Sequence, residues 1–280
     1  MTTNCSCRRD WVAESLQQGG VDVRQVIVDE AGTTTEPEVL APLTLGKAVQ
    51  RIVLVGDHRQ LRPVVKNRDA AAFGLARSLF EHLATQEHGD DDVDGLDEKE
   101  SWPKQVMLTQ QYRMHPDMNR FPSEHFYDGL VQSAVSTHTR PGGILQHPHT
   151  GDMRSVLFWH TPEDAVESVQ EVATDAASMR SRVNPEEARR CVRLAVDLIH
   201  NSKSHSVAIL SWYNAQVVEL KRLLAREHPN GSAVHCGSVV TSQGSEWDYV
   251  ILSTVRAWPG NAKPGTYRGD AASLFHGSQE

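Results

Sequence analysis

The chain has 280 residues, with 28 lysines and arginines against 36 aspartates and glutamates, so its formal net charge at pH 7 is −8. Eight acidic residues and one lysine between residues 87 and 100 account for −7 of this charge, so the acidic average does not exclude a basic surface elsewhere. No apolar run approaches the roughly 18 residues that span a bilayer, and the N-terminus lacks the apolar core of a signal peptide. Four cysteines, at positions 5, 7, 191 and 236, are too few and too scattered for a disulfide framework, which favours a reducing, intracellular compartment.

The first part of the chain is typical of an α/β fold. Short β-branched runs at 26–28 and 52–55 show no alternation, which is typical of strands buried on both faces of a parallel sheet. Residues 36–47 between them predict a helix, and apolar spacing predicts another helix over 70–84.

The middle of the chain is predicted to be less regular. The acidic segment 87–100 is too charged to bury and predicts a disordered surface loop. Residues 106–108 predict a strand. From 119 to 161 the many prolines and glycines predict loops, with one strand at 156–159.

Regular structure is predicted to return near residue 184. Asn184 and Pro185, followed by two glutamates, predict the N-cap and first turn of a helix. Further strands are predicted at 207–210, 234–240 and 249–255, and a helix at 214–227. Strands that alternate with helices in both halves predict an α/β fold with two parallel-sheet domains, residues 1–115 and 116–280.

Polar side chains follow two of the predicted strands. Asp29 and Glu30 come directly after the first strand, and Asp57 and Gln60 follow the second. Ligands of parallel sheets bind beyond the carboxyl ends of the strands. Asp29 could hold Mg²⁺ through water, Glu30 could polarise an attacking water, and Gln60 could contact a γ-phosphate. The alternative for the Asp-Glu pair alone is a surface pair at a strand exit.

Other segments could contact phosphates or bases. Tyr112 and Arg113 combine a ring that can stack with a guanidinium that can bind phosphate, although each alone could pack in a hinge. Residues 241–246 form a small polar turn that could offer backbone N–H groups to phosphates and Glu246 to a ribose. By itself this segment is only a turn, and capping alone explains Asn214.

The order of these motifs resembles the superfamily 1 helicases of the nonsense-mediated-decay helicase type, and among them the helicase-with-zinc-finger proteins. The segments with this resemblance are VIVDEAG (26–32), IVLVGDHRQLRPVV (52–65), GLARSLFEHL (74–83), LTQQYRMHPDMNRFPSEHFYDGLV (108–131), VAILSWYNAQVVELKRLL (207–224) and VVTSQGSEWDYVILSTVRA (239–257). They follow the family order over nearly the whole chain, and QYRMHP together with GDHRQL is highly specific.

The resemblance implies two RecA-like domains that bind ATP and Mg²⁺ and move along single-stranded RNA or DNA, with possible protein cofactors. It makes Asp29 the Mg²⁺ ligand, Glu30 the base for water, Gln60 the γ-phosphate sensor and Arg113 a phosphate contact. It further implies nucleotide contacts at Asp57, Tyr112, Gln243, Gly244 and Glu246, with Tyr112 on adenine and Glu246 on ribose. Contacts with the nucleic-acid strand are implied for Thr241, Ser242 and Asn214.

Two motifs of the family do not occur in the sequence. No G-x-x-x-x-G-K-[ST] phosphate loop is present, and the final arginine motif is also absent, since Arg256 belongs to the preceding strand. We therefore expect both RecA-like domains to be incomplete, and the 280 residues alone to lack useful ATPase activity, as a fragment or truncated paralogue would. The alternatives are a catalytically inactive interaction or regulatory module, and a metal-dependent nuclease that uses Asp29, Glu30 and Asp57.

Overall fold

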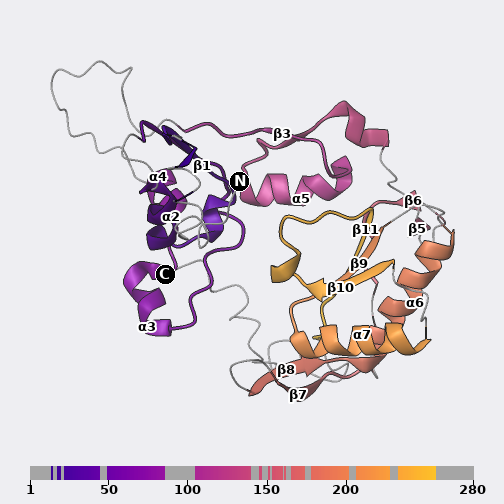
Figure 1. Ribbon diagram of the computed structural model, residues 1–280. Helices are drawn as coiled ribbons and strands as arrows, with labels where there is room; N and C mark the ends of the chain where they lie inside the picture. Colours follow the sequence, from indigo (N-terminus) through magenta and orange to yellow (C-terminus); the bar gives the residue numbers. More distant parts are fainter. Residues whose placement is uncertain are drawn as a thin grey trace. The chain divides into compact units, whose positions relative to one another are not determined.

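The computed structural model describes residues 14, 18–19, 22–44, 49–85, 105–139, 145–146, 151, 153–159, 161, 165–173, 178–201, 206–227 and 233–256 (Figure 1). The chain divides into two compact units, Met1–Arg140 and Pro141–Glu280, and each is described by itself. The acidic segment 87–100 and the cysteines at positions 5 and 7 lie outside the described residues. Within the described ranges, no helix is long and apolar enough to cross a membrane.

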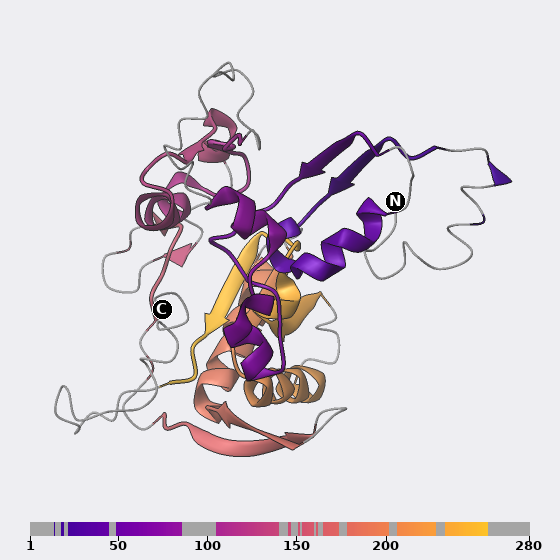
Figure 2. The ribbon, with the colours of Figure 1, turned by 90° about the vertical axis from the view of Figure 1, so that its left-hand side faces the viewer.

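The first unit contains the predicted strand–helix–strand. Strand β1 (Gln25–Val28) pairs in parallel with β2 (Arg51–Leu54), and α2 (Glu36–Leu43) connects them. Figure 2 shows the two strands side by side, next to α2. Helix α2 starts with a capping box, in which the Thr35 N–H and hydroxyl both donate to the Glu38 carboxylate, at 3.0 and 2.8 Å.

Among the described residues of these two strands only Val26 and Val28 are buried, so the prediction of strands buried on both faces is wrong here. Val26 and Val28 are buried against Val39 of α2. On the opposite face Ile27 is 63% exposed and its register partner Val53 is 41% exposed.

The helix predicted over 70–84 is broken into pieces. Helix α3 (Arg68–Ala70) runs into the π-helical η2 (Ala71–Leu75), and α4 (Leu79–Ala84) starts anew. Gly74 adopts a φ of 96°, which a side chain disfavours and glycine allows. Ser78 then caps α4, because its hydroxyl oxygen accepts the Glu81 N–H at 3.0 Å.

The rest of the first unit is built around α5 (Pro116–Phe126), which connects the short parallel strands β3 (Gln110–Gln111) and β4 (Gln132–Ser133), before η4 (Val135–Thr139). Two predictions are wrong here. The strand expected at 106–108 is irregular, and most of α5 lies in the stretch that was predicted to be loops.

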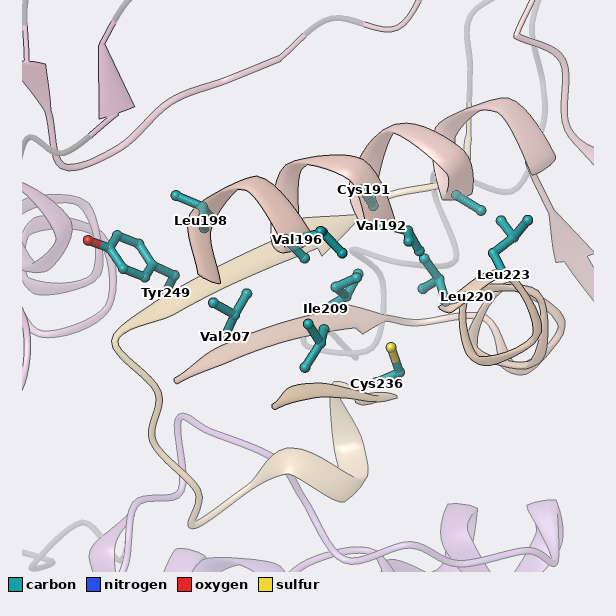
Figure 3. Packing of buried hydrophobic residues seen from close by; sticks show 13 residues of the cluster. Cys191, Val192, Val196, Leu198, Val207, Ile209, Leu220, Leu223, Cys236 and Tyr249 are labelled. Atoms are coloured by element: carbon teal, nitrogen blue, oxygen red, sulfur yellow. The ribbon is translucent and has the colours of Figure 1, made fainter. Parts of the chain in front are cut away.

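The second unit contains a parallel sheet of three strands in the order β10 (Val234–Ser238), β9 (Val207–Ser211), β11 (Tyr249–Ser253). Helices α6 (Pro185–Asn201) and α7 (Asn214–Glu227) pack on one face of it, where Val192, Leu220 and Leu223 meet Ile209 (Figure 3). The strands predicted at 207–210, 234–240 and 249–255 and the helix predicted at 214–227 are confirmed to within two residues at their ends. Parallel sheets with connecting helices in both units confirm the α/β class.

Two antiparallel pairs were not predicted. The longer pair is formed by β7 (Ser168–Ala173) and β8 (Ser178–Val183), and the shorter by β5 (Leu145–Gln146) and β6 (Met153–Arg154). Residues 156–159 form no strand, contrary to prediction.

Candidate functional site

The loops that follow β1 and β2 lie against each other, backbone to backbone. The Val55 N–H donates to the Val28 carbonyl at 2.8 Å, and the Ala31 N–H donates to the Val55 carbonyl at 2.9 Å. A Cβ on Gly32 would lie 2.6 Å from the Asp57 carbonyl oxygen, and a Cβ on Gly56 would lie 2.8 Å from the Gly32 nitrogen. Glycine at both positions therefore permits this close approach.

The predicted pair Asp29 and Glu30 lies at the exposed carboxyl end of β1. Glu30 adopts a left-handed φ of 53°, uncommon for a residue with a side chain. This conformation is held locally: Asp29 Oδ1 accepts the Glu30 N–H at 3.0 Å, and the Thr33 N–H and hydroxyl donate to the Glu30 carbonyl at 3.0 and 2.9 Å. Strained backbone of this kind is concentrated at functional sites.

The chemistry of Asp29 fits Mg²⁺. Its second carboxylate oxygen, Oδ2, accepts no hydrogen bond from a described residue, so it can face an ion or its water. Mg²⁺ is usually held by one or two carboxylates together with several waters, so the site does not need a cage of protein ligands. Within the described ranges no group of three His, Cys, Asp or Glu side chains forms such a cage.

Asp57 is the centre of a small hydrogen-bonded cluster after β2. Its Oδ1 accepts the Arg59 N–H at 2.9 Å, and its Oδ2 accepts both the Gln60 amide at 2.8 Å and the Tyr127 hydroxyl at 2.6 Å. Partial burial and the neighbouring Asp57 carboxylate raise the pKa of Tyr127 to about 12, so the hydroxyl keeps its proton and stays a donor. Sequence reasoning found Asp57 and Gln60 but missed Tyr127.

The loop with Tyr112 and Arg113 is folded by the side chain of Gln111. Its amide oxygen accepts the N–H groups of Arg113 and Met114 at 2.8 and 2.7 Å. Its amide nitrogen donates to the Met114 carbonyl and to the Ser133 hydroxyl, both at 2.7 Å. Tyr112 and Arg113 are exposed on this loop, and the Tyr112 hydroxyl donates to the Gln110 side chain at 2.7 Å.

The predicted residues of the second unit follow β10 and β9. Thr241 and Ser242 lie in η5 (Val240–Ser242), where Ser242 is buried and donates to the Ser238 carbonyl at 2.7 Å. Gly244 adopts a φ of 77° in the exposed turn that follows, next to the half-buried Gln243. Two further candidates, Glu246 and Asn214, the first residue of α7, are exposed.

A buried polar network lies behind the end of β11. The Glu187 carboxylate accepts the Ser253 hydroxyl at 2.7 Å and the Val255 N–H at 3.0 and 3.1 Å, while Val255 has a φ of 68°. Asn184 and Gln216, both fully buried, extend it: Gln216 Oε1 accepts the Asn184 N–H at 2.8 Å, and Gln216 Nε2 donates to the Ser253 hydroxyl at 2.9 Å. Sequence reasoning saw only the N-cap in this network, which is confirmed because Asn184 Oδ1 accepts the Glu187 N–H at 3.1 Å.

The first unit thus brings Asp29, Glu30, Asp57 and Gln60 to the same edge of one sheet, because the two loops that hold them are in backbone contact. This edge is the carboxyl end of both strands, where α/β proteins bind ligands. Its exposed carboxylates and amide have the chemistry to handle a metal-bound phosphate and an attacking water.

Comparison with known proteins identifies the family. Two family models described as AAA domains match residues 1–68 and 75–270. The chain is 39% identical over 254 residues to the human 3'-5' exoribonuclease HELZ2, a match that covers 90% of this chain and 8% of the relative. It is 35% identical over 253 residues to an Arabidopsis thaliana regulator of nonsense transcripts 1 homolog (88% of this chain, 18% of the relative) and 32% identical over 244 residues to the Saccharomyces cerevisiae ATP-dependent helicase NAM7 (84% and 22%).

The chain therefore spans less than a quarter of the length of each of these relatives. The family models and the relatives confirm what the motif order predicted. The chain belongs to the AAA-domain family and, within it, to the superfamily 1 helicases of the nonsense-mediated-decay helicase type.

Proposed function

We propose that this chain forms the central part of an ATP-dependent helicase that couples ATP hydrolysis to movement along single-stranded RNA or DNA in the nucleus and/or cytoplasm. The observation on which the proposal rests is the shared edge of β1 and β2. There Asp29 and Glu30 lie beside the loop of Asp57 and Gln60, and backbone hydrogen bonds of 2.8 and 2.9 Å join the two loops. The names of relatives such as the ATP-dependent helicase NAM7 support ATP as the nucleotide.

In this proposal each residue at the edge has one task. Asp29 holds Mg²⁺, which neutralises charge on the phosphate oxygens when bound. Glu30 accepts a proton from the attacking water, and its exposed position at the strand end supports this role. Gln60 contacts the γ-phosphate, with Asp57 beside it.

The loop that Gln111 folds supplies the remaining contacts in the first unit. Arg113 binds a phosphate through its guanidinium, which stays charged at any physiological pH. Tyr112, exposed on the same loop, stacks on the adenine. We propose that the helicase domains are residues 1–115 and 116–280, so that this loop ends the first of them.

In the second unit we propose contacts to both ligands. Gln243, Gly244 and Glu246 bind the nucleotide, with Glu246 on the ribose. Thr241, Ser242 and Asn214 contact the nucleic-acid strand. Their position in the turn after β10 and at the start of α7 supports this assignment, since both lie at carboxyl ends of parallel strands. Protein cofactors of the complete protein are also part of the proposal.

The test joins the 280 residues to the upstream phosphate-loop segment of a relative, because the sequence itself holds no G-x-x-x-x-G-K-[ST] run. We expect the joined protein to hydrolyse ATP and to be stimulated by single-stranded RNA, whereas the 280 residues alone stay near background. Glu30→Gln and Arg113→Ala in the joined protein should each lower kcat by about 10²-fold or more.

The matched control is Asp69→Asn, which removes another exposed carboxylate of the same unit and should leave kcat unchanged. A joined protein that folds but hydrolyses no ATP would support the alternative of a catalytically inactive interaction module. Unchanged turnover in Arg113→Ala would remove its proposed phosphate contact.

A further inference from the structure

The C-terminal end of α5 and the residues directly after it are joined to the loop that follows β2 by hydrogen bonds and an ion pair. The Tyr127 hydroxyl donates to Asp57 Oδ2 at 2.6 Å, across 70 residues of sequence. The Arg59 guanidinium donates to the Phe126 carbonyl and lies 3.9 Å from the Asp128 carboxylate. Two independent links between the same two segments hold them in one arrangement.

The chemistry of these groups fixes which atom faces which. A carboxylate only accepts hydrogen bonds, so the donors to Asp57 Oδ2 must be the amide nitrogen of Gln60 and the hydroxyl of Tyr127. The amide oxygen of Gln60 is therefore directed away from Asp57. Without the Tyr127 proton, the Asp57 carboxylate would be held only by the Arg59 N–H and by the Gln60 amide itself, so the orientation of that amide would be less fixed.

Helix α5 links this cluster to the loop of Tyr112 and Arg113. The helix starts at Pro116, three residues after Arg113, and its 11 residues span about 16 Å. The side chains of Asn119 and Ser123 both donate to the Val131 carbonyl, at 2.9 and 2.8 Å, so the helix is also fixed against the segment that leads into β4. One rigid element thus connects the two loops of the first unit that are proposed to contact phosphate.

We propose that Tyr127 is a positioning residue of the nucleotide sensor: through Asp57 it sets the orientation of the Gln60 amide, and through α5 it ties the Gln60 loop to the loop of Tyr112 and Arg113. The consequence for catalysis rests on the proposed function, since it requires Gln60 to contact the γ-phosphate. The orientation of the amide itself does not depend on that function.

The first experiment therefore uses the 280-residue chain without nucleotide. Glutamine side-chain amides are labelled with ¹⁵N, the Gln60 signal is assigned by its loss in Gln60→Glu, and its hydrogen exchange is compared between wild type and Tyr127→Phe. We expect exchange of the Gln60 amide to become about tenfold faster in Tyr127→Phe, since the substitution removes a hydrogen bond to the charged Asp57 carboxylate and leaves the acceptor of the Gln60 amide less fixed. Tyr249→Phe, which removes a hydroxyl in the other unit, should leave it unchanged.

The second experiment measures ATP hydrolysis by the joined protein. Tyr127→Phe should lower kcat about tenfold and leave KM for ATP unchanged, because Gln60 acts at the reacting phosphate rather than on the rest of the nucleotide. Because partial unfolding would also lower the apparent kcat without changing KM, kcat is referred to the folded fraction of each variant.

The two experiments distinguish a failure of the proposed function from a failure of the positioning role of Tyr127. If the joined wild-type protein hydrolyses no ATP, the proposed function fails, and the amide exchange alone decides whether Tyr127 positions Gln60. Exchange of the Gln60 amide within twofold of wild type in Tyr127→Phe overturns the inference, as does an unchanged kcat in an active joined protein.

Discussion

Substitution of Glu187, a buried carboxylate in the first turn of α6, should destabilise the second unit. In Glu187→Ala the Val255 N–H and the Ser253 hydroxyl lose the acceptor that they share, at 3.0 and 2.7 Å. Val255 and Ser253 are both fully buried, so water cannot replace the carboxylate without local opening. Glutamate and alanine have similar helix propensities, so a change in stability would report the lost network.

The size of the effect follows from the two donors. An unsatisfied buried N–H costs about 1–3 kcal/mol, and Val255, which has a φ of 68°, is fully buried. The Ser253 hydroxyl can rotate, so it adds less. We expect a loss of about 2–4 kcal/mol in the free energy of unfolding for Glu187→Ala, and about 1–2 kcal/mol for Glu187→Gln, which keeps one acceptor oxygen.

The assay is urea denaturation of the 280-residue chain, with hydrogen exchange in β9 and β11 to assign the change to the second unit. Glu186→Ala is the matched control. This neighbour is partly exposed, and among the described residues it pairs with Arg189 and Arg190 on the same helix, contacts worth about 0.2–0.5 kcal/mol each. If Glu187→Ala and Glu186→Ala had the same effect, the network would contribute no stability and the reasoning would be refuted.

Two other predictions concern packing and thiol chemistry. Gly32→Ala places a methyl group 2.6 Å from the Asp57 carbonyl and should cost about 1–3 kcal/mol, seen as faster hydrogen exchange in β1 and β2; unchanged exchange would contradict the close approach. Burial raises the pKa of Cys191 to about 12 and of Cys236 to about 11, so both thiols should resist alkylation at pH 8 until urea unfolds the chain. Rapid alkylation of Cys191 or Cys236 in the native chain would contradict their burial. Because the pKa values of both thiols in the folded chain exceed the usual 9.0, the free energy of unfolding should fall as pH rises from about 9 towards 11.

The fold was most predictable where local signals determine it. Helix α7 has the predicted bounds, Asn214–Glu227, and α6 starts directly after its predicted cap. In both cases the residues that start the helix act within one turn, as the Asn184 cap on the Glu187 N–H illustrates. Strands β9 and β11 of the second unit are largely apolar runs, and α7 separates β9 from β10, so these elements also require no distant information.

The errors in the predicted secondary structure have three sources: a glycine, a proline and the pairing of strands. The apolar spacing of 70–84 is helical, but Gly74 takes a left-handed conformation that the spacing does not reveal. Pro122 indicates a break, yet it lies inside α5. The hairpin of β7 and β8 depends on which residues face each other, such as Ser168 and Val183, and no residue pattern within either strand determines this.

The difference between local and distant signals also divides the functional residues into two groups. Some are expected to contact a ligand, and others, which we call anchors, hold the end of a strand in place through a hydrogen bond. Asp29 and Glu30 were found because their position directly after a strand is itself the signal. Tyr127 was missed because its partner Asp57 is 70 residues away, and Glu187 because Ser253 is 66 residues away.

The fold explains why such anchors are required. In a parallel sheet the chain leaves every strand at the edge where ligands bind, and there the backbone has no further strand to pair with. Asp57 lies just beyond β2 and Val255 just beyond β11, and in each unit a hydrogen bond to a carboxylate fixes that exit, from Tyr127 to Asp57 and from Val255 to Glu187. Such an anchor must come from another element, which is why it is distant in sequence. Substitution of an anchor should therefore weaken the site without removing any group that touches a ligand.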